Sequence, residues 1–122
     1  NTHINVADVK WKTHHCVLGF NVMGIWPPYA DGTDINAVDA VPHKGIVATA
    51  NDTGGFVRLH NFPCVVRNAP GKEYNGHSSH VMGLRFMRDG DLLMTCGGND
   101  RSVVVWDVRR DESLNDPDGF RR

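Results

Sequence analysis

The sequence lacks a long hydrophobic run, and it lacks a large excess of either charge. Its apolar stretches stay well short of the ~18 residues that a membrane-spanning helix needs, and no signal-type apolar segment opens the chain. The 13 Lys and Arg residues are offset by 14 Asp and Glu residues, which leaves a formal net charge of -1. This balance provides no broad positive surface for nucleic acid or for an anionic membrane. Both absences argue against a pore, a transporter and a histone-like protein.

Cysteine is scarce as well. The three cysteines, Cys16, Cys64 and Cys96, are widely spaced and form no Cys-x-x-Cys motif. An odd number leaves at least one thiol unpaired within the chain, whereas a secreted chain of this length more often has a denser, even set. We therefore expect reduced, intracellular thiols that behave as small buried apolar side chains.

Convincing helix signals are missing, and short β-branched or aromatic runs recur in their place. Clusters of Gly, Asn, Asp and Pro separate these runs, as in a chain of strands joined by tight turns. The expected strands are residues 2–9, 15–19, 35–41, 45–50, 56–61, 80–87, 92–96 and 102–108. Many short strands at near-regular spacing predict an all-β sandwich, barrel or propeller.

Two segments do not fit a strand. Trp26-Pro27-Pro28-Tyr29 contains successive prolines, which remove ladder donors, so we expect a rigid loop that leads out of a strand. Residues 111–122 are polar and contain Pro117 and Gly119, which is typical of a tail or a linker.

The middle of the chain contains an internal repeat. When the sequence is shifted against itself by 46 residues, apolar positions coincide without a gap. The coinciding pairs include Ile35 with Val81, Val38 with Leu84, Ala40 with Phe86, Ile46 with Leu92, Ala48 with Met94, Thr49 with Thr95, Val57 with Val103, Leu59 with Val105, His60 with Trp106 and Phe62 with Val108. A repeat of about this length made of short strands indicates propeller blades.

The second copy carries a further signature. Gly76-His77 precedes its first strand, Asp100 lies in the turn before its third strand, and Trp106-Asp107 ends that strand. This arrangement resembles the WD40 repeat, which has Gly-His near its start and Trp-Asp at its close. The resemblance implies a polar network in which the turn Asp accepts a hydrogen bond from the His, and the His contacts a strand hydroxyl that reaches the indole N–H of the Trp.

His77, Asp100 and Trp106 match this WD40 pattern, and we expect them to form the structural network of the blade. The expected place of the hydroxyl falls at Cys96, and Thr95 is one residue off, which would put it on the other face of the strand. The first copy is more degenerate, because His60-Asn61 stands where Trp-Asp would be.

A narrower resemblance covers most of the chain. The motifs that carry it are Trp11-Lys12-Thr13, Cys16-Val17-Leu18-Gly19, Gly24-Ile25-Trp26-Pro27, Asp34-Ile35-Asn36-Ala37-Val38, Phe62-Pro63-Cys64, Gly76-His77-Ser78-Ser79-His80-Val81 and Gly97-Gly98-Asn99-Asp100. In this order they resemble the echinoderm microtubule-associated protein-like (EMAP-like) family. Members of that family carry two fused, atypical WD40 propellers, and this segment is similar to the last blades of the second one.

The resemblance implies an all-β fold of about two four-stranded antiparallel WD40-type blades, a fragment of a larger propeller. We expect residues 1–33 to hold the outer strand or strands of a preceding blade and the Trp-Pro-Pro loop. Residues 34–75 would form an atypical blade, residues 76–110 the blade with Gly-His and Trp-Asp, and residues 111–122 a polar tail or linker.

The family resemblance also implies a function. EMAP-like proteins associate with microtubules or soluble tubulin, so we expect a non-catalytic interaction scaffold in the cytoplasm at the cytoskeleton. Should this segment itself contact tubulin, the basic candidates are Lys10, Lys12, Arg85, Arg88 and Arg101. The alternative is a WD40 adaptor that binds a signalling or ciliary peptide without direct microtubule contact.

Motifs for catalysis or ligand binding are absent or incomplete. His77-x-x-His80 lacks the second ligand pair of a zinc site, and Asp31-Gly32-Thr33-Asp34 lacks the alternating oxygen ligands of an EF-hand. The chain has no Gly-x-Ser-x-Gly motif, and the Gly97-Gly98 turn lacks the Gly-Lys-Ser/Thr ending of a phosphate loop. We expect no enzyme, cofactor, metal or nucleic-acid partner.

Isolated blades would expose apolar sheet edges that a closed propeller covers. We therefore predict that the 122-residue chain buries strand surface against further blades or another chain, and that it forms no stable monomer by itself. Size-exclusion chromatography and urea unfolding test this. A monomer with a single cooperative unfolding transition would contradict it.

Overall fold

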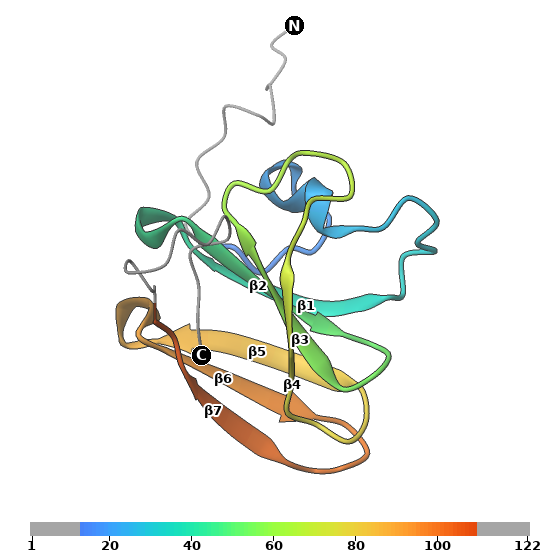
Figure 1. Cartoon of the computed structure of the whole chain (residues 1–122), viewed down its shortest axis with the longest axis vertical. Helices are drawn as coiled ribbons and strands as arrows, with labels where there is room; N and C mark the ends of the chain where they lie inside the picture. Colours follow the sequence, from blue (N-terminus) through green and yellow to red (C-terminus); the bar gives the residue numbers. More distant parts are fainter. Residues whose placement is uncertain (1–12, 110–122) are drawn as a thin grey trace, which may run out of the picture.

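The computed structural model describes residues 13–109, which form two antiparallel β-sheets and contain no α-helix (Figure 1). The first sheet comprises β1 (Ile35–Val41), β2 (Ile46–Asn51), β3 (Phe56–Asn61) and β4 (Lys72–Asn75), in that spatial order. The second comprises β5 (Val81–Met87), β6 (Leu92–Gly97) and β7 (Val103–Asp107). Three short 3-10 helices accompany them: η2 (Phe20–Ile25), η3 (Pro42–Lys44) and η4 (Arg88–Gly90).

Six of the eight expected strands are confirmed to within one residue at either end, namely β1, β2, β3, β5, β6 and β7. Turn chemistry explains this agreement, because Gly and Asp mark the hairpins on both sides of β2 and β6. The expected strand at residues 2–9 lies outside the described residues, as does the polar segment 111–122.

The expectation of a strand at residues 15–19 is wrong. The Gly19 N–H donates to the Cys16 carbonyl at 3.3 Å, and the chain then enters η2. Val17 and Val22 pack onto the first sheet as part of a loop and a 3-10 turn. The Trp-Pro-Pro segment is a loop as expected, but it follows η2 rather than a strand.

One strand was missed, and one sheet is smaller than expected. β4 reads Lys-Glu-Tyr-Asn, a polar edge strand without the apolar alternation that indicates a strand. The first sheet obtains its fourth strand after a loop that follows β3. The second sheet has three strands within residues 13–109, since the described chain ends two residues after β7.

The two sheets reproduce the 46-residue repeat in three dimensions. β1 and β2 pair with a register irregularity between Ile35 and Ala37, and β5 and β6 pair with the same irregularity between Val81 and Gly83. Each first hairpin also closes on a 3-10 turn, η3 or η4. The shared bulge and turn mean that residues 46 apart occupy equivalent places in the two sheets.

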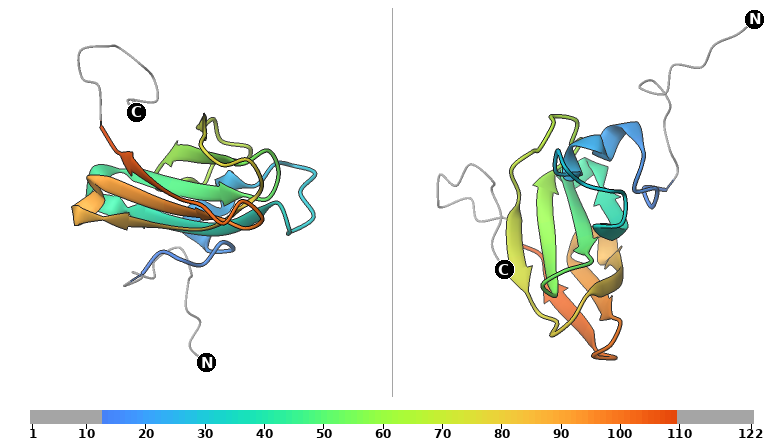
Figure 2. Two further views of the ribbon diagram at one scale, coloured as in Figure 1. Left: turned by 90° about the horizontal axis from the view of Figure 1, so that it is seen from below. Right: turned by 90° about the vertical axis from the view of Figure 1, so that its right-hand side faces the viewer.

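The main core lies between the sheets, which are adjacent in both views of Figure 2. The first sheet contributes Val41, Ile46, Ala48, Ala50, Val57 and Leu59 to it. Leu93 is the buried residue that meets them from the middle of the second sheet, and Leu84, Phe86 and Trp106 pack around it. Burial of this apolar area holds the sheets together at roughly 25 cal/mol per Å².

The opposite face of the first sheet is covered too. Val38, Ala40 and Val47 pack there against Val22 and Ile25 of the segment that precedes the sheet. That segment lies on the side of the first sheet away from the second (Figure 1). Both faces of the first sheet are therefore buried.

Within residues 13–109, one face of the second sheet is left uncovered, and we call it the open face. Its residues are Gly83, Arg85, Met87, Leu92, Met94, Cys96, Val103, Val105 and Asp107. Val103 is 62% exposed and Val105 is 55% exposed, whereas their repeat equivalents Val57 and Leu59 are 1% and 8% exposed. The open face is thus the counterpart of the face of the first sheet that the second sheet buries.

The cysteines depart in part from expectation. Cys64 is buried, and burial raises the pKa of its thiol to about 11. Cys16 and Cys96 are exposed, contrary to the expectation of buried side chains. For Cys96 the reason is its place on the open face. All three are free thiols.

Candidate functional site

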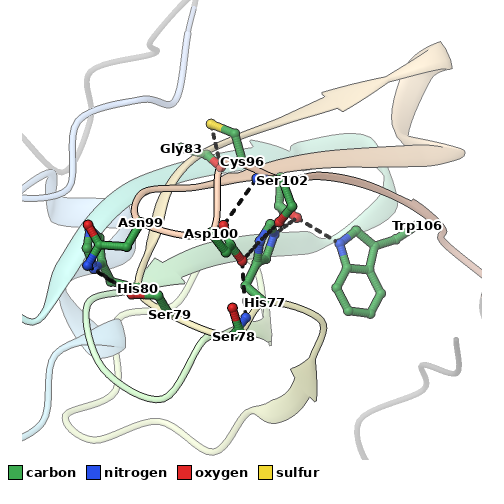
Figure 3. A network of polar contacts seen from close by, with 11 residues as sticks. His77, Ser78, Ser79, His80, Gly83, Cys96, Asn99, Asp100, Ser102 and Trp106 are labelled. Carbon is green, nitrogen blue, oxygen red and sulfur yellow. Dashed lines mark hydrogen bonds and ion pairs between the residues drawn. The ribbon is translucent and has the colours of Figure 1, made fainter.

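A buried imidazole joins the segment before β5 to β6 and to the turn between β6 and β7 (Figure 3). His77 lies in the segment between β4 and β5, and its side chain is completely buried. Its Nε2 atom is 2.8 Å from the Thr95 hydroxyl, and its Nδ1 atom is 3.2 Å from Asp100 Oδ2 and 2.9 Å from Ser102 Oγ. The indole N–H of Trp106 donates to the same Thr95 hydroxyl at 3.0 Å. The structure therefore brings His77, Asp100 and Trp106 into one network.

The hydrogen-bond directions in this network follow from donor and acceptor chemistry. The Thr95 oxygen accepts the Trp106 N–H, so its own proton is available for His77 Nε2. His77 then carries its proton on Nδ1 and donates it to the Asp100 carboxylate. We assign this tautomer from the hydrogen-bond network. Both ring nitrogens of His77 are engaged by protein oxygens.

The Asp100 carboxylate fastens the turn between β6 and β7. It accepts the backbone N–H of Ser78 at 3.1 Å and that of Ser102 at 3.2 Å, besides its contact with His77. Burial on its own would raise the pKa of Asp100, but hydrogen bonds from Ser102, Ser78 and His77 outweigh that effect and lower the pKa to about 2. The charged form is therefore the one that this site stabilises.

Two glycines make room for the network. A Cβ atom on Gly76 would collide with the Trp106 indole, and one on Gly97 would collide with the Asp100 carboxylate. The Gly of the Gly-His pair is therefore required because the indole packs directly on the backbone that precedes His77.

The hydroxyl of the network is Thr95, and the expectation that its place falls at Cys96 is wrong. Trp106 pairs with Leu93 and Val104 pairs with Thr95, so Thr95 and Trp106 are diagonal neighbours on one face. Cys96 points to the open face on the other side, where its Sγ atom is 3.7 Å from the Gly83 carbonyl oxygen. Counting backwards from Trp106 in steps of two leads to Cys96, so only the observed pairing of β6 with β7 identifies Thr95.

The first sheet has no equivalent network. Thr49 and His60 take the places of Thr95 and Trp106, but the Thr49 hydroxyl lies 3.1 Å from Asn51 Oδ1, and His60 Nδ1 lies 2.9 Å from the Pro70 carbonyl. Gly54 stands at the position of Asp100. The polar network thus belongs to the second sheet alone.

The basic candidates do not form one patch in the described chain. Arg88 lies in η4 at one end of β6, and Arg101 lies in the turn at the other end of that strand. Arg85 is exposed in the middle of β5, on the open face. Lys10 and Lys12 lie outside the described residues.

Among residues 13–109, no group of three or more His, Cys, Asp or Glu side chains is placed to hold a metal ion. No helix within the same residues is long and apolar enough to cross a membrane.

Comparison with known proteins decides the family. The family model described as the echinoderm microtubule-associated protein second beta-propeller matches residues 1–108. The chain belongs to the EMAP-like family. The two sheets are accordingly blades of a β-propeller, as the sequence resemblance implied.

Several EMAP-like proteins are similar to this chain over most of its length. Echinoderm microtubule-associated protein-like 2 from Rattus norvegicus is 48% identical over 103 residues, which cover 84% of this chain and 16% of the relative. Echinoderm microtubule-associated protein-like 1 from Homo sapiens is 44% identical over 101 residues, which cover 83% of this chain and 12% of the relative. The chain thus spans less than a fifth of the length of these curated relatives.

The role of the Thr95 hydroxyl can be tested by substitution. In a chimera in which this chain replaces the matching segment of the rat relative's second propeller, Thr95→Val leaves the Trp106 N–H and His77 Nε2 without their shared partner. We expect a loss of about 2–3 kcal/mol in the free energy of unfolding, measured by urea denaturation. Cys96→Ala is the matched control and should change the value by less than about 1 kcal/mol. Equal losses in both variants would contradict the assignment of the hydroxyl.

The charge of Asp100 should make the stability depend on pH. Because the pKa is lowered from 3.8 to about 2 on folding, the stabilising contribution is complete above about pH 4 and is lost as the pH falls through about 2. In the same chimera, Asp100→Asn should lower the Tm at pH 7, and the difference from the unsubstituted chimera should shrink between pH 4 and pH 2. A difference that stays constant over this range would exclude a role for the carboxylate charge.

Proposed function

We propose that this chain is a non-catalytic part of a protein-interaction scaffold in a microtubule-associated EMAP-like protein of the cytoplasm and cytoskeleton. The observation that carries the proposal is the match of residues 1–108 to the second propeller of this family. The names of the relatives state that they are microtubule-associated. The mechanism is the presentation of loops on a rigid β framework.

The role proposed for His77, Asp100 and Trp106 is to hold that framework. Their network ties the segment before β5 to the turn between β6 and β7 and to the end of β7. A completely buried imidazole with both nitrogens engaged resists local opening, because opening would leave polar groups unsatisfied. The segment before β5 and the turn between β6 and β7, which lie at the same end of the second sheet, thereby keep a fixed geometry.

The open face is proposed to contact another blade. Its repeat equivalent on the first sheet is buried by the second sheet, so continuation of the same stacking would bury the open face against a further sheet. This proposal also accounts for Val103 and Val105, large apolar side chains that a free surface would leave in water.

Tubulin contact is proposed to involve exposed basic residues of the loops. Arg88 and Arg101 are exposed and belong to opposite ends of β6. One flat partner surface would contact one end of a blade, and so only one of these two arginines. Lys10 and Lys12 remain candidates from the sequence.

The test is co-sedimentation of the chimeric second propeller alone with polymerised tubulin, with a salt titration. We expect binding to persist at physiological salt, and we expect either Arg88→Glu or Arg101→Glu, but not both, to weaken it about fivefold. Equal weakening by both would indicate unspecific charge attraction. Binding that survives only at low salt would favour the adaptor that binds a signalling or ciliary peptide.

A further inference from the structure

Two polar side chains of β1 connect the first sheet to the second. The Asn36 side-chain amide donates to the Val81 carbonyl oxygen at 2.9 Å. The Asp39 carboxylate accepts the backbone N–H of Phe86 at 2.8 Å and is almost completely buried. The interface between these neighbouring blades therefore depends on a donor and an acceptor that the first sheet supplies.

The same two positions carry different chemistry in the second sheet. The residues 46 positions after Asn36 and Asp39 are Met82 and Arg85. The strand register agrees with this correspondence, since Asp39 pairs with Ala48 and Arg85 pairs with Met94, which is the repeat equivalent of Ala48. The Arg85 side chain thus projects from the second sheet on the side that corresponds to that of Asp39 in the first sheet. This side is the open face.

An arginine cannot replace an aspartate in such an interface. The guanidinium group has hydrogen-bond donors and no acceptor, so it cannot receive a backbone N–H from a neighbouring strand. Arg85 is exposed, and it takes part in none of the ion pairs present within residues 13–109. Its cross-strand partner on the open face is Met94, and Val105 follows on the next strand. A sheet that covers this face would bury the charge, and burial of an unpaired charge is strongly unfavourable.

We propose that the open face binds a neighbouring blade whose facing strand presents a carboxylate to Arg85. The inference rests on the proposed function, in which the open face packs against a further blade of the propeller. A second copy of this chain packed by the same face would bring a second Arg85 to the interface. The acid that the open face carries, Asp107, lies at the end of β7 and has its carboxylate 3.6 Å from Arg109.

The change of charge gives the two blade interfaces different specificities. The covered face of the first sheet accepts a backbone N–H through Asp39, and the open face requires an acceptor opposite Arg85. A blade suited to one face leaves an unpaired polar group at the other. Such a difference favours one order of blades over another, because wrong pairing is penalised as well as right pairing rewarded.

The experiment is a complementation assay with the whole 122-residue chain. Its partner is the second propeller of the rat relative with the matching segment removed. Residues of the partner strand that faces the open face are changed, one at a time, to Glu and to Lys. At one position we expect Glu to bind the unsubstituted chain at least about tenfold more tightly than Lys, and we expect Arg85→Glu to reverse that preference.

Two controls accompany the scan. Arg67→Glu changes another exposed arginine, which lies in the loop between β3 and β4 and outside the open face, so it should leave the preference unchanged. Cys96 lies on the open face, and its reaction with maleimide should slow at least about tenfold in the complex, as burial of a thiol predicts.

The outcomes separate the two proposals. If the chain binds no version of the partner, or if Cys96 reacts equally fast with and without it, the packing of a further blade on the open face is wrong. If the chain binds and Cys96 is protected, but no position shows a preference that Arg85→Glu reverses, only the carboxylate partner of Arg85 is wrong. Self-association of the chain in place of complex formation would also overturn the inference.

Discussion

The need of each sheet to bury both of its faces is the constraint on which the rest of this structure depends. A β-strand presents side chains to two sides, and in the first sheet both sets are apolar. The second sheet covers one face and the segment around η2 covers the other. The second sheet repeats the same pattern, but within residues 13–109 only one of its faces is covered. The open face is the direct consequence of a two-sided repeat.

Polar contacts complement this apolar packing and fix its geometry. Lys44 of η3 contacts Asp91, just after η4, at 2.6 Å, and the Asp39 carboxylate accepts the Phe86 N–H. The two sheets are therefore joined both at these turns and between β1 and β5. Within the second sheet, the His77 imidazole bridges Thr95 and Asp100. The apolar faces provide most of the driving force for association, whereas these directional contacts select one register and one orientation.

Much of the fold could be read from the residues, and the failures have physical causes. β1 and β3 were located to the residue because turn-forming Gly and Asp bound their apolar runs. β4 was missed because an edge strand buries little and needs no apolar alternation. The segment at residues 15–19 looks like a strand locally, but no neighbouring strand pairs with it, and it packs on the first sheet as a loop.

The candidate site likewise has features that the sequence predicted and features that only the structure decided. The sequence by itself determined the strand-and-turn repeat and the spacing of His77, Asp100 and Trp106, because these depend on local chain geometry and on a fixed signature. Only the tertiary structure decided that Thr95 rather than Cys96 supplies the hydroxyl, since that choice depends on which residues of β6 and β7 are paired. Only the tertiary structure also placed Arg85 at the position equivalent to Asp39, facing outward from the last described sheet. Pairing and stacking join residues that are far apart in the chain, and no local pattern specifies which face of a strand such contacts will cover.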